Sequence, residues 1–306
     1  MRAGTGTLLN FTLKFGEKNL RDYLEEIVKP AFLNGNVRTV GKKTRFLFLN
    51  VEIHDFDSSG KKPDLALLGQ FVKDTVLEST QVLKGSELVD QYDELRSSPS
   101  ATFALFLNDH RLIYFADAPH APDYSSFKST ALNFLKKERN KHINREYKKF
   151  RGLEGKTVTK SQLTKLIAVP SLNILPIPNA QSAKEFVRSF DNLQTLTFKV
   201  IDGNDEAQAS QFFEDMKNVS GGLNADGTAR FNNKDGLEKD EAADLVAGAA
   251  ENGITKVKAT GKGEAGERLV KTSQDLTVEV ELNPLPPTKR GKIRSLLASF
   301  SQINLR

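Results

Sequence analysis

The stretch Ala101–Phe150 constrains the fold of this chain more than any other. It begins with two apolar runs, Ala101–Leu107 and Arg111–Phe115, which flank the polar pair Asn108–Asp109. Two such runs around a short turn predict an antiparallel hairpin, and the nearly all-apolar first run predicts a buried strand. An elbow with two prolines, Asp117–Asp123, leads into a run whose apolar residues have helical spacing. We therefore expect a central hairpin followed by a long helix.

Residues that alternate between apolar and polar predict further strands on the N-terminal side of this hairpin. In Gly69–Leu83 neither alternating set is purely apolar, so we expect this strand at a sheet edge or partly exposed. Glu17–Leu33 has apolar residues at helical spacing and predicts an amphipathic helix that Pro30 bends or ends. The other predicted strands are Thr7–Phe15, Val37–Val40 and Arg45–Phe56.

A glycine- and lysine-rich segment, Arg151–Thr159, predicts a link between two domains. Beyond it, strands alternate with helices and end in an antiparallel pair, which favours a sheet covered on one side. The strands are Leu163–Ile177, Leu193–Ile201, Ile254–Thr260 and Leu269–Leu282, and the helices are Ala180–Phe190, Asn204–Asn218 and Leu237–Glu251. The sequence thus predicts an α+β chain of two mixed α/β domains. Residues 1–152 contain a central antiparallel sheet and a long basic helix, residues 160–284 form the second domain, and residues 285–306 form a basic amphipathic tail.

The composition excludes several classes of protein. The chain of 306 residues contains no cysteine, which rules out disulfides, thiolate metal sites and cysteine nucleophiles. No apolar run approaches the roughly 18 residues that a membrane span needs, and the first residues have the pattern of a strand rather than of a signal peptide. We therefore expect a cytoplasmic protein without membrane contact. The formal net charge of +5 is small, so the distribution of charge matters more than its sum.

Positive charge is densest at the C-terminal end of the predicted long helix, where Glu138 and Glu146 are the acidic residues. A row of cations on a helix can neutralise successive backbone phosphates, and Tyr147 and Phe150 could stack on bases. The alternative is a solvated helix face whose long side chains cover apolar surface. The candidate contacts to nucleic acid, DNA or RNA, are Lys136, Lys137, Arg139, Lys141, Arg145, Lys148, Lys149 and Arg151.

The residues that could support nuclease chemistry form no complete signature. Arg139 and His142 lie one helical turn apart and could serve metal-independent RNA cleavage, but their spacing is shorter than the usual pattern of helical nucleases. A metal-dependent nuclease needs carboxylates that converge on a cation, and four acids that lie close in sequence lack that spacing. They are Asp55, Asp57, Asp64 and Asp74. A nuclease toxin is therefore the alternative to a binding protein without enzymatic activity.

A glycine-rich segment near the C-terminus lacks the neighbouring elements that a nucleotide-binding loop needs. Gly261–Gly266 matches the letters of a dinucleotide-binding loop, but it lies between two strands and opens no helix. A hairpin turn is the better interpretation. We therefore expect no cofactor and no metal.

The C-terminal tail suggests a further alternative. Between Lys289 and Arg306, apolar residues recur at helical spacing among lysines and arginines. Such a segment could dock on a protein partner, and the chain would then be a regulatory or inhibitory subunit. The apolar residues are Ile293, Leu296, Leu297 and Phe300.

Four segments of strand, turn and helix have a recognisable pattern when they are taken together. They are Gly69–Leu83, Pro99–Pro122, Phe127–Tyr147 and Ser189–Glu206. This combination resembles an uncharacterised group of bacterial proteins carried on mobile elements and in phage-defence neighbourhoods. The resemblance implies a biological setting and no catalytic residues. With the basic helix, it leads to the hypothesis of a nucleic-acid-binding protein, for example a DNA-binding one, in a bacterial anti-phage or mobile-element system.

Overall fold

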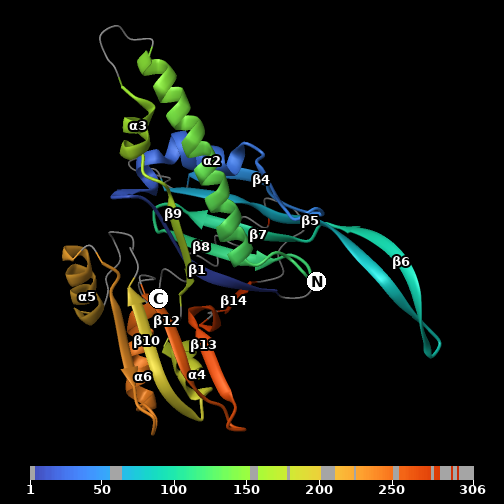
Figure 1. Ribbon diagram of the computed structural model, residues 1–306, viewed down its shortest axis with the longest axis vertical. Coiled ribbons are helices and arrows are strands. Elements are labelled where there is room, and N and C mark those ends of the chain that lie inside the picture. The colour runs from blue at the N-terminus through green and yellow to red at the C-terminus, as the bar shows by residue number, and fades with distance from the viewer. Residues whose placement is uncertain are drawn as a thin grey trace. The chain divides into compact units, whose positions relative to one another are not determined.

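The computed structural model describes residues 4–55, 64–151, 158–177, 180–200, 211–223, 225–250, 255–276 and 279–282, together with Gly291 and Ser295. The chain divides into two compact units. Unit 1 consists of Met1–Leu13, Asp109–Ile113 and Leu172–Arg306, and unit 2 consists of Lys14–Asn108 and Tyr114–Ser171. Both units contain helices and strands, so the chain has the α+β fold that the sequence predicted (Figure 1).

An antiparallel sheet with the strand order β7-β5-β4-β3 forms the centre of unit 2. Its strands are β3 (Val37–Val40), β4 (Thr44–Asp55), β5 (Leu65–Lys84) and β7 (Ser100–Phe106). Alternate residues of a strand point to opposite faces of the sheet. One face carries four buried phenylalanines, which are Phe46, Phe48, Phe71 and Phe103. Phe48 pairs with Phe71 across β4 and β5, and a register shifted by one residue would expose this set.

Strand β5 lies inside the sheet, so of the two alternatives predicted for Gly69–Leu83 the edge position is wrong for the first half. Partial exposure is confirmed there for Gly69, Gln70, Lys73 and Asp74. That half pairs with β7 on one side and with β4 on the other. Phe71 has no exposed surface. The polar residues that suggested an edge position lie mainly in the second half of the strand, which leaves the sheet.

The second half of β5 pairs with β6 (Glu87–Ser97) in a two-stranded ribbon, seen at the right of Figure 1. The sequence predicted no strand over β6. Large apolar side chains of the ribbon are exposed, among them Leu77, Leu83, Leu88 and Leu95. A ribbon exposed on both faces needs no purely apolar side, and the alternation that reveals a half-buried strand is therefore missing from β6.

Helix α2 (Tyr124–Arg151) covers the phenylalanine face of unit 2, as the spacing of its apolar residues predicted. The helix begins where the Asp123 carboxylate accepts a hydrogen bond from the Ser126 amide at 2.7 Å. The rings of Phe127 and Phe134 lie 5.2 and 5.6 Å from the ring of Phe48. The two strands of the predicted hairpin are present as β7 and β8 (Arg111–Ala116).

The predicted helix Glu17–Leu33 is a series of three short helices. They are a 3-10 helix η1 (Leu20–Tyr23), a π-helix η2 (Leu24–Val28) and α1 (Lys29–Leu33). Pro30 lies in the first turn of α1, where a missing amide hydrogen removes no helical hydrogen bond. The proline therefore begins the last helix of the series instead of ending the segment.

The segment Leu163–Ile177, predicted as one strand, is the helix α3 (Lys160–Leu166) followed by the strand β9 (Ser171–Pro176). A capping box begins the helix. The Gln162 amide donates to the Thr159 hydroxyl at 3.2 Å, and the Thr159 amide donates to the Gln162 side chain at 2.8 Å. The sequence contains this signal, but the apolar and β-branched residues that follow it favoured a strand.

Unit 1 contains a four-stranded antiparallel sheet with the order β11-β10-β12-β13. The strands are β10 (Asn192–Val200), β11 (Thr228–Asn232), β12 (Thr255–Lys262) and β13 (Arg268–Thr272), and the helices are α4 (Ala180–Arg188), α5 (Gln211–Gly222) and α6 (Lys239–Ala250). Phe198 and Val257 of the sheet share one buried cluster with Val187 of α4 and Val246 of α6. In Figure 1 the helices α4 and α6 lie behind the sheet. This is the sheet covered on one side that the sequence predicted.

The last predicted strand, Leu269–Leu282, contains two strands with different partners. They are β13 and β14 (Glu279–Leu282), and β14 pairs with β1 (Gly4–Phe15), as β9 does. The glycine-rich segment Gly261–Gly266 lies at the hairpin between β12 and β13, where Lys262 faces Arg268. The hairpin interpretation of these glycines is therefore confirmed. Of the predicted helix over residues 204–218, residues 204–210 lie outside the described part of the chain, and α5 begins at Gln211.

Candidate nucleic-acid interface

Helix α2 exposes seven of the eight basic residues that the sequence singled out. Its buried side includes Phe134 and Leu135, and in the following turns it continues through His142 and Ile143. The remaining circumference faces solvent. The exposed basic residues are Lys136, Lys137, Lys141, Arg145, Lys148, Lys149 and Arg151.

Four of these cations form a single row along the helix, which we term the α2 row. Its members are Lys137, Lys141, Lys148 and Arg151, at offsets of 0, 4, 11 and 14 residues. Offsets of this kind bring residues to one face of an α-helix, and 14 residues correspond to about 21 Å of helix. Exposed Asn144 completes the row between Lys141 and Lys148. The sequence contains the charges, and the helix orders them in a line.

Few acidic groups neutralise these cations. Lys141 pairs with the buried Glu138 at 2.6 Å, and Lys149 pairs with Glu146 at 2.7 Å. The pKa of the Glu146 carboxyl is lowered, chiefly by its hydrogen bond with Lys149. Within the described part of the chain, four of the cations have no ion-pair or hydrogen-bond partner. These are Lys136, Lys137, Lys148 and Arg151.

Arg139 does not belong to this interface, which corrects the sequence prediction for this residue. Its side chain is 5% exposed, and its guanidinium donates to main-chain carbonyls at the end of α3. Nε lies 2.8 Å from the carbonyl oxygen of Ile167 and 2.9 Å from that of Ala168, and Nη2 lies 2.9 Å from that of Thr164. The last carbonyls of a helix have no partner within the helix, and a guanidinium fork can satisfy several at once. Burial lowers the pKa of Arg139, yet a guanidinium stays charged.

His142 is buried as well, so the described structure presents no exposed Arg–His pair for RNA cleavage. The His142 side chain is 9% exposed, and its ring lies 6.2 Å from the ring of Tyr23. Burial is the main cause of a lowered His142 pKa, while Glu146 and Glu26 raise it and Arg145 and Lys149 lower it further. Both residues of the proposed pair therefore have structural roles on the inner side of α2.

The buried imidazole leads to a prediction about pH. Because the folded state holds His142 neutral below its ordinary pKa of 6.5, acidification protonates the unfolded chain first. We expect the His142 contribution to stability to be complete above about pH 6.5 and to decline as the pH falls below that value. Urea unfolding at pH values on either side of 6.5 should show a smaller loss for His142→Gln than for the wild type. An equal loss in both proteins would contradict this role of His142.

The acids that suggested a metal-dependent nuclease do not form one group. Asp64 lies beside Asp55, to whose carboxylate its amide donates at 2.9 Å, but Asp74 lies far from both. Asp55 pairs with Leu65 at one end of the β4–β5 pair, and Asp74 pairs with Arg45 at the other. Ten residues of strand separate these ends, which is about 33 Å. Asp57 lies outside the described residues. Among the residues that the structure describes, no group of three or more histidine or acidic side chains could hold a metal ion.

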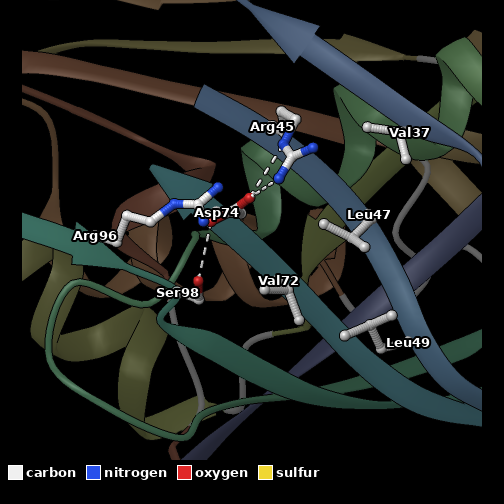
Figure 2. Close-up of a pocket in the computed structure, with 8 residues that line it drawn as sticks. All are labelled: Val37, Arg45, Leu47, Leu49, Val72, Asp74, Arg96 and Ser98. Atoms are coloured by element: carbon white, nitrogen blue, oxygen red, sulfur yellow. Dashed lines mark hydrogen bonds and ion pairs between the residues drawn. The ribbon is translucent and has the colours of Figure 1, made fainter. Parts of the chain in front are cut away.

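Asp74 instead lies in a shallow hollow of about 380 Å³ on the face of the unit 2 sheet that α2 does not cover. Figure 2 shows Asp74 between Arg45 and Arg96, with Ser98 beside it. Arg45 and Ser98 hydrogen-bond to the carboxylate and are the main causes of its lowered pKa. The rest of the lining is apolar and consists of Val37, Leu47, Leu49 and Val72. The Asp74 carboxylate thus links β5 to Arg45 of β4 and to Ser98 between β6 and β7, and these bonds occupy it.

The remaining predicted contacts are placed as follows. Tyr147 and Phe150 are partly exposed near the end of α2. Of the tail Lys289–Arg306, only Gly291 and Ser295 lie in the described part of the chain. No protein-family model matches the sequence, and no curated protein matches it significantly. In the part of the chain that the structure describes, no helix is both long and apolar enough to cross a membrane.

Proposed function

We propose that the protein binds nucleic acid by placing the α2 row against the phosphate backbone. The observation that carries this proposal is the line of exposed lysine and arginine side chains with few acidic neighbours. Cations that neutralise backbone phosphates release condensed counterions, which gives affinity without sequence preference. Contacts between these cations and phosphates need no backbone amides, ordered waters or bases. The helix can therefore bind nucleic acid without a pocket.

The stability of α2 alone does not account for the row. Cations in the last turn of a helix interact favourably with the helix dipole, which is a structural reason for Lys148, Lys149 and Arg151. The effect is confined to that turn. Lys141 also has a structural reason for its charge, because it pairs with the buried Glu138. Lys137 lies 14 residues before the end of α2 at Arg151 and belongs to no described ion pair, so neither the dipole nor an ion pair explains its charge, whereas a polyanionic partner does.

The biological setting follows the family resemblance. We propose that the protein acts in the bacterial cytoplasm, within an anti-phage defence or mobile-element system. The tail Lys289–Arg306 is then a proposed docking segment for a protein partner. If cells that carry a variant with a reversed α2 row resist phage as well as wild-type cells do, this setting for the α2 row is wrong.

The proposed domain organisation is the one that the sequence predicts. Residues 1–152 form a first domain that ends in the basic helix, residues 160–284 form a second, and residues 285–306 form a tail. The compact units differ from these bounds, because residues 1–13 and 109–113 group with the C-terminal part of the chain. Cleavage between residues 152 and 160 that leaves two folded fragments would support the proposed bounds, and unfolded fragments would favour the units.

The direct test of the α2 row is a charge reversal, Lys137→Glu with Lys148→Glu. Loss of two phosphate contacts should lower the slope of log affinity against log salt by about 1.8 for duplex DNA. At low salt we expect at least about a tenfold loss of affinity. Fluorescence anisotropy with labelled duplex and single-stranded probes at two salt concentrations measures both quantities.

A matched control changes the net charge equally at exposed lysines far from α2 in sequence. Lys42 lies in the turn before β4, and Lys84 ends β5. The variant Lys42→Glu with Lys84→Glu should bind nearly as the wild type does. If the α2 variant and this control bind alike, the row is a solvated helix face and the proposed interface fails.

A further inference from the structure

The four-stranded sheet of unit 1 has a second face that its own helices do not cover. Side chains of β10 and β12 alternate: Leu196, Phe198, Val257 and Ala259 enter the buried cluster with α4 and α6. The residues between them point to the opposite face. In Figure 1 this face is turned toward the viewer, with α4 and α6 behind it. We term it the open face.

The open face is strongly basic. Each of its four strands contributes at least one cation, and every one of these cations is exposed. The basic residues are Lys199 of β10, Arg230 of β11, Lys256, Lys258 and Lys262 of β12, and Arg268 of β13. Among the described ion pairs, one involves this face, between Lys199 and Asp226. Six cations therefore face one paired carboxylate.

The register of the sheet places like charges side by side. Lys199 of β10 lies directly opposite Lys256 of β12, and Lys262 of β12 lies directly opposite Arg268 of β13. Like charges at directly opposed positions destabilise an antiparallel pair. Asp226 lowers the repulsion at the first pair, and its pKa is lowered mainly by the hydrogen bond from Lys199. Folding alone therefore does not explain this arrangement of charge.

We infer that the open face is a second contact surface for the backbone of nucleic acid. Hydroxyl groups lie between the cations at Thr197 and Thr260, and threonine hydroxyls commonly donate to phosphate oxygens. The cations extend over six residues of β12, about 20 Å, and across four strands, about 14 Å. An anion of this extent with regularly spaced charges is a polynucleotide.

The other side chains of the open face reduce the range of possible partners. Its exposed large apolar residue among those described is Val270 of β13, opposite Thr260. Apolar or aromatic anchors beside the cations would strengthen binding to a membrane surface, and the described residues of this face provide almost none. The described positions of the open face hold no aromatic ring, so bases are not stacked there. The face therefore contacts phosphates and does not read sequence.

This inference extends the proposed function, since it assigns a second surface for the same class of ligand. It does not depend on the α2 row, because the open face belongs to unit 1 and the row belongs to unit 2. The two surfaces can therefore be removed separately. A protein with two such surfaces would bind a long polynucleotide more tightly than a short one.

The test reverses two neighbouring cations of β12, Lys256→Glu with Lys258→Glu. We expect at least about a fivefold loss of affinity for a mixed-sequence single strand and a salt slope lower by about 1.4, which corresponds to two phosphates. A glutamate at position 256 would lie opposite Lys199 and near Asp226, so attraction to the first is offset by repulsion from the second and the thermal midpoint should change little. An unchanged midpoint shows that a loss of binding does not come from unfolding.

The matched control reverses two exposed cations of α4, Lys184→Glu with Arg188→Glu, on the helical side of the same unit. It changes the net charge equally and should bind as the wild type does. If the β12 variant binds like this control while the α2 variant loses affinity, the inference fails and the α2 row stands. If the β12 variant alone loses affinity, the open face stands and the α2 row fails. Retained nucleic-acid affinity together with lost binding to phosphatidylserine vesicles would identify the face as a membrane contact and overturn the inference.

Discussion

Replacing Phe127 with alanine is expected to lower the free energy of unfolding by about 3–5 kcal/mol. The Phe127 ring has no exposed surface, and it lies at the centre of the aromatic core of unit 2. Its centroid lies 5.1 Å from that of Phe103, 5.2 Å from Phe48 and 5.5 Å from Phe71. The truncation removes contacts with three strands at once and leaves a cavity that the rigid sheet cannot close.

Urea unfolding monitored by circular dichroism measures this loss. Leu166→Ala in α3 is the control, because that side chain is 67% exposed and its truncation should change stability by no more than about 0.5 kcal/mol. Phe127→Leu keeps more of the volume and should lie between the two. A loss below about 1 kcal/mol for Phe127→Ala would show that α2 does not pack on the sheet as described. Such a result would also mean that the sheet does not fix which side of α2, and therefore which cations of the α2 row, faces solvent.

The sequence predicted those elements whose apolar residues follow one clear period. Helix α2 is the best case, because Ala131 follows Phe127 by four residues, Phe134 and Leu135 follow Ala131 by three and four, and all are buried. Strand β5 is the opposite case. Its first half is central and its second half is a ribbon exposed on both faces, so no single period describes it. Pairing partners, which differ between its two halves, are not encoded in the local pattern.

The sequence predicted which residues of the candidate site are charged, but not which of their side chains point to solvent and which point into the protein. Lys137 and Arg139 are two residues apart and both basic, yet Lys137 is exposed whereas Arg139 is buried, with 5% of its surface exposed. The difference arises from α3, whose last carbonyls lie about 25 residues further along the chain. The open face was missed for a related reason. Each strand shows only one to three cations, and the basic surface exists only once the register sets Lys199 beside Lys256.

Replacing Arg139 with alanine is expected to destabilise the protein by about 3 kcal/mol, because hydrogen bonds from charged donors contribute about 1.5–3 kcal/mol and the buried carbonyl of Ile167 would be left unsatisfied. The partly buried carbonyls of Thr164 and Ala168 would lose the same donor. Arg139→Lys keeps the charge but not the planar fork, so it should recover only part of the loss. Hydrogen exchange should become faster in α3, whose last turn loses its anchor.

The same variant separates the two roles that Arg139 could have. Lys137→Ala is the matched control, since it removes an exposed cation of α2 and should leave stability unchanged within about 0.5 kcal/mol. The effects on nucleic-acid affinity should be the opposite of those on stability. Lys137→Ala should weaken binding, whereas folded Arg139→Lys should bind as the wild type does. If Arg139→Ala proved as stable as the wild type and bound nucleic acid more weakly, Arg139 would contact phosphate after all. The guanidinium would then have to leave the carbonyls at the end of α3, and the burial that excludes it from the α2 row would describe only the unbound state.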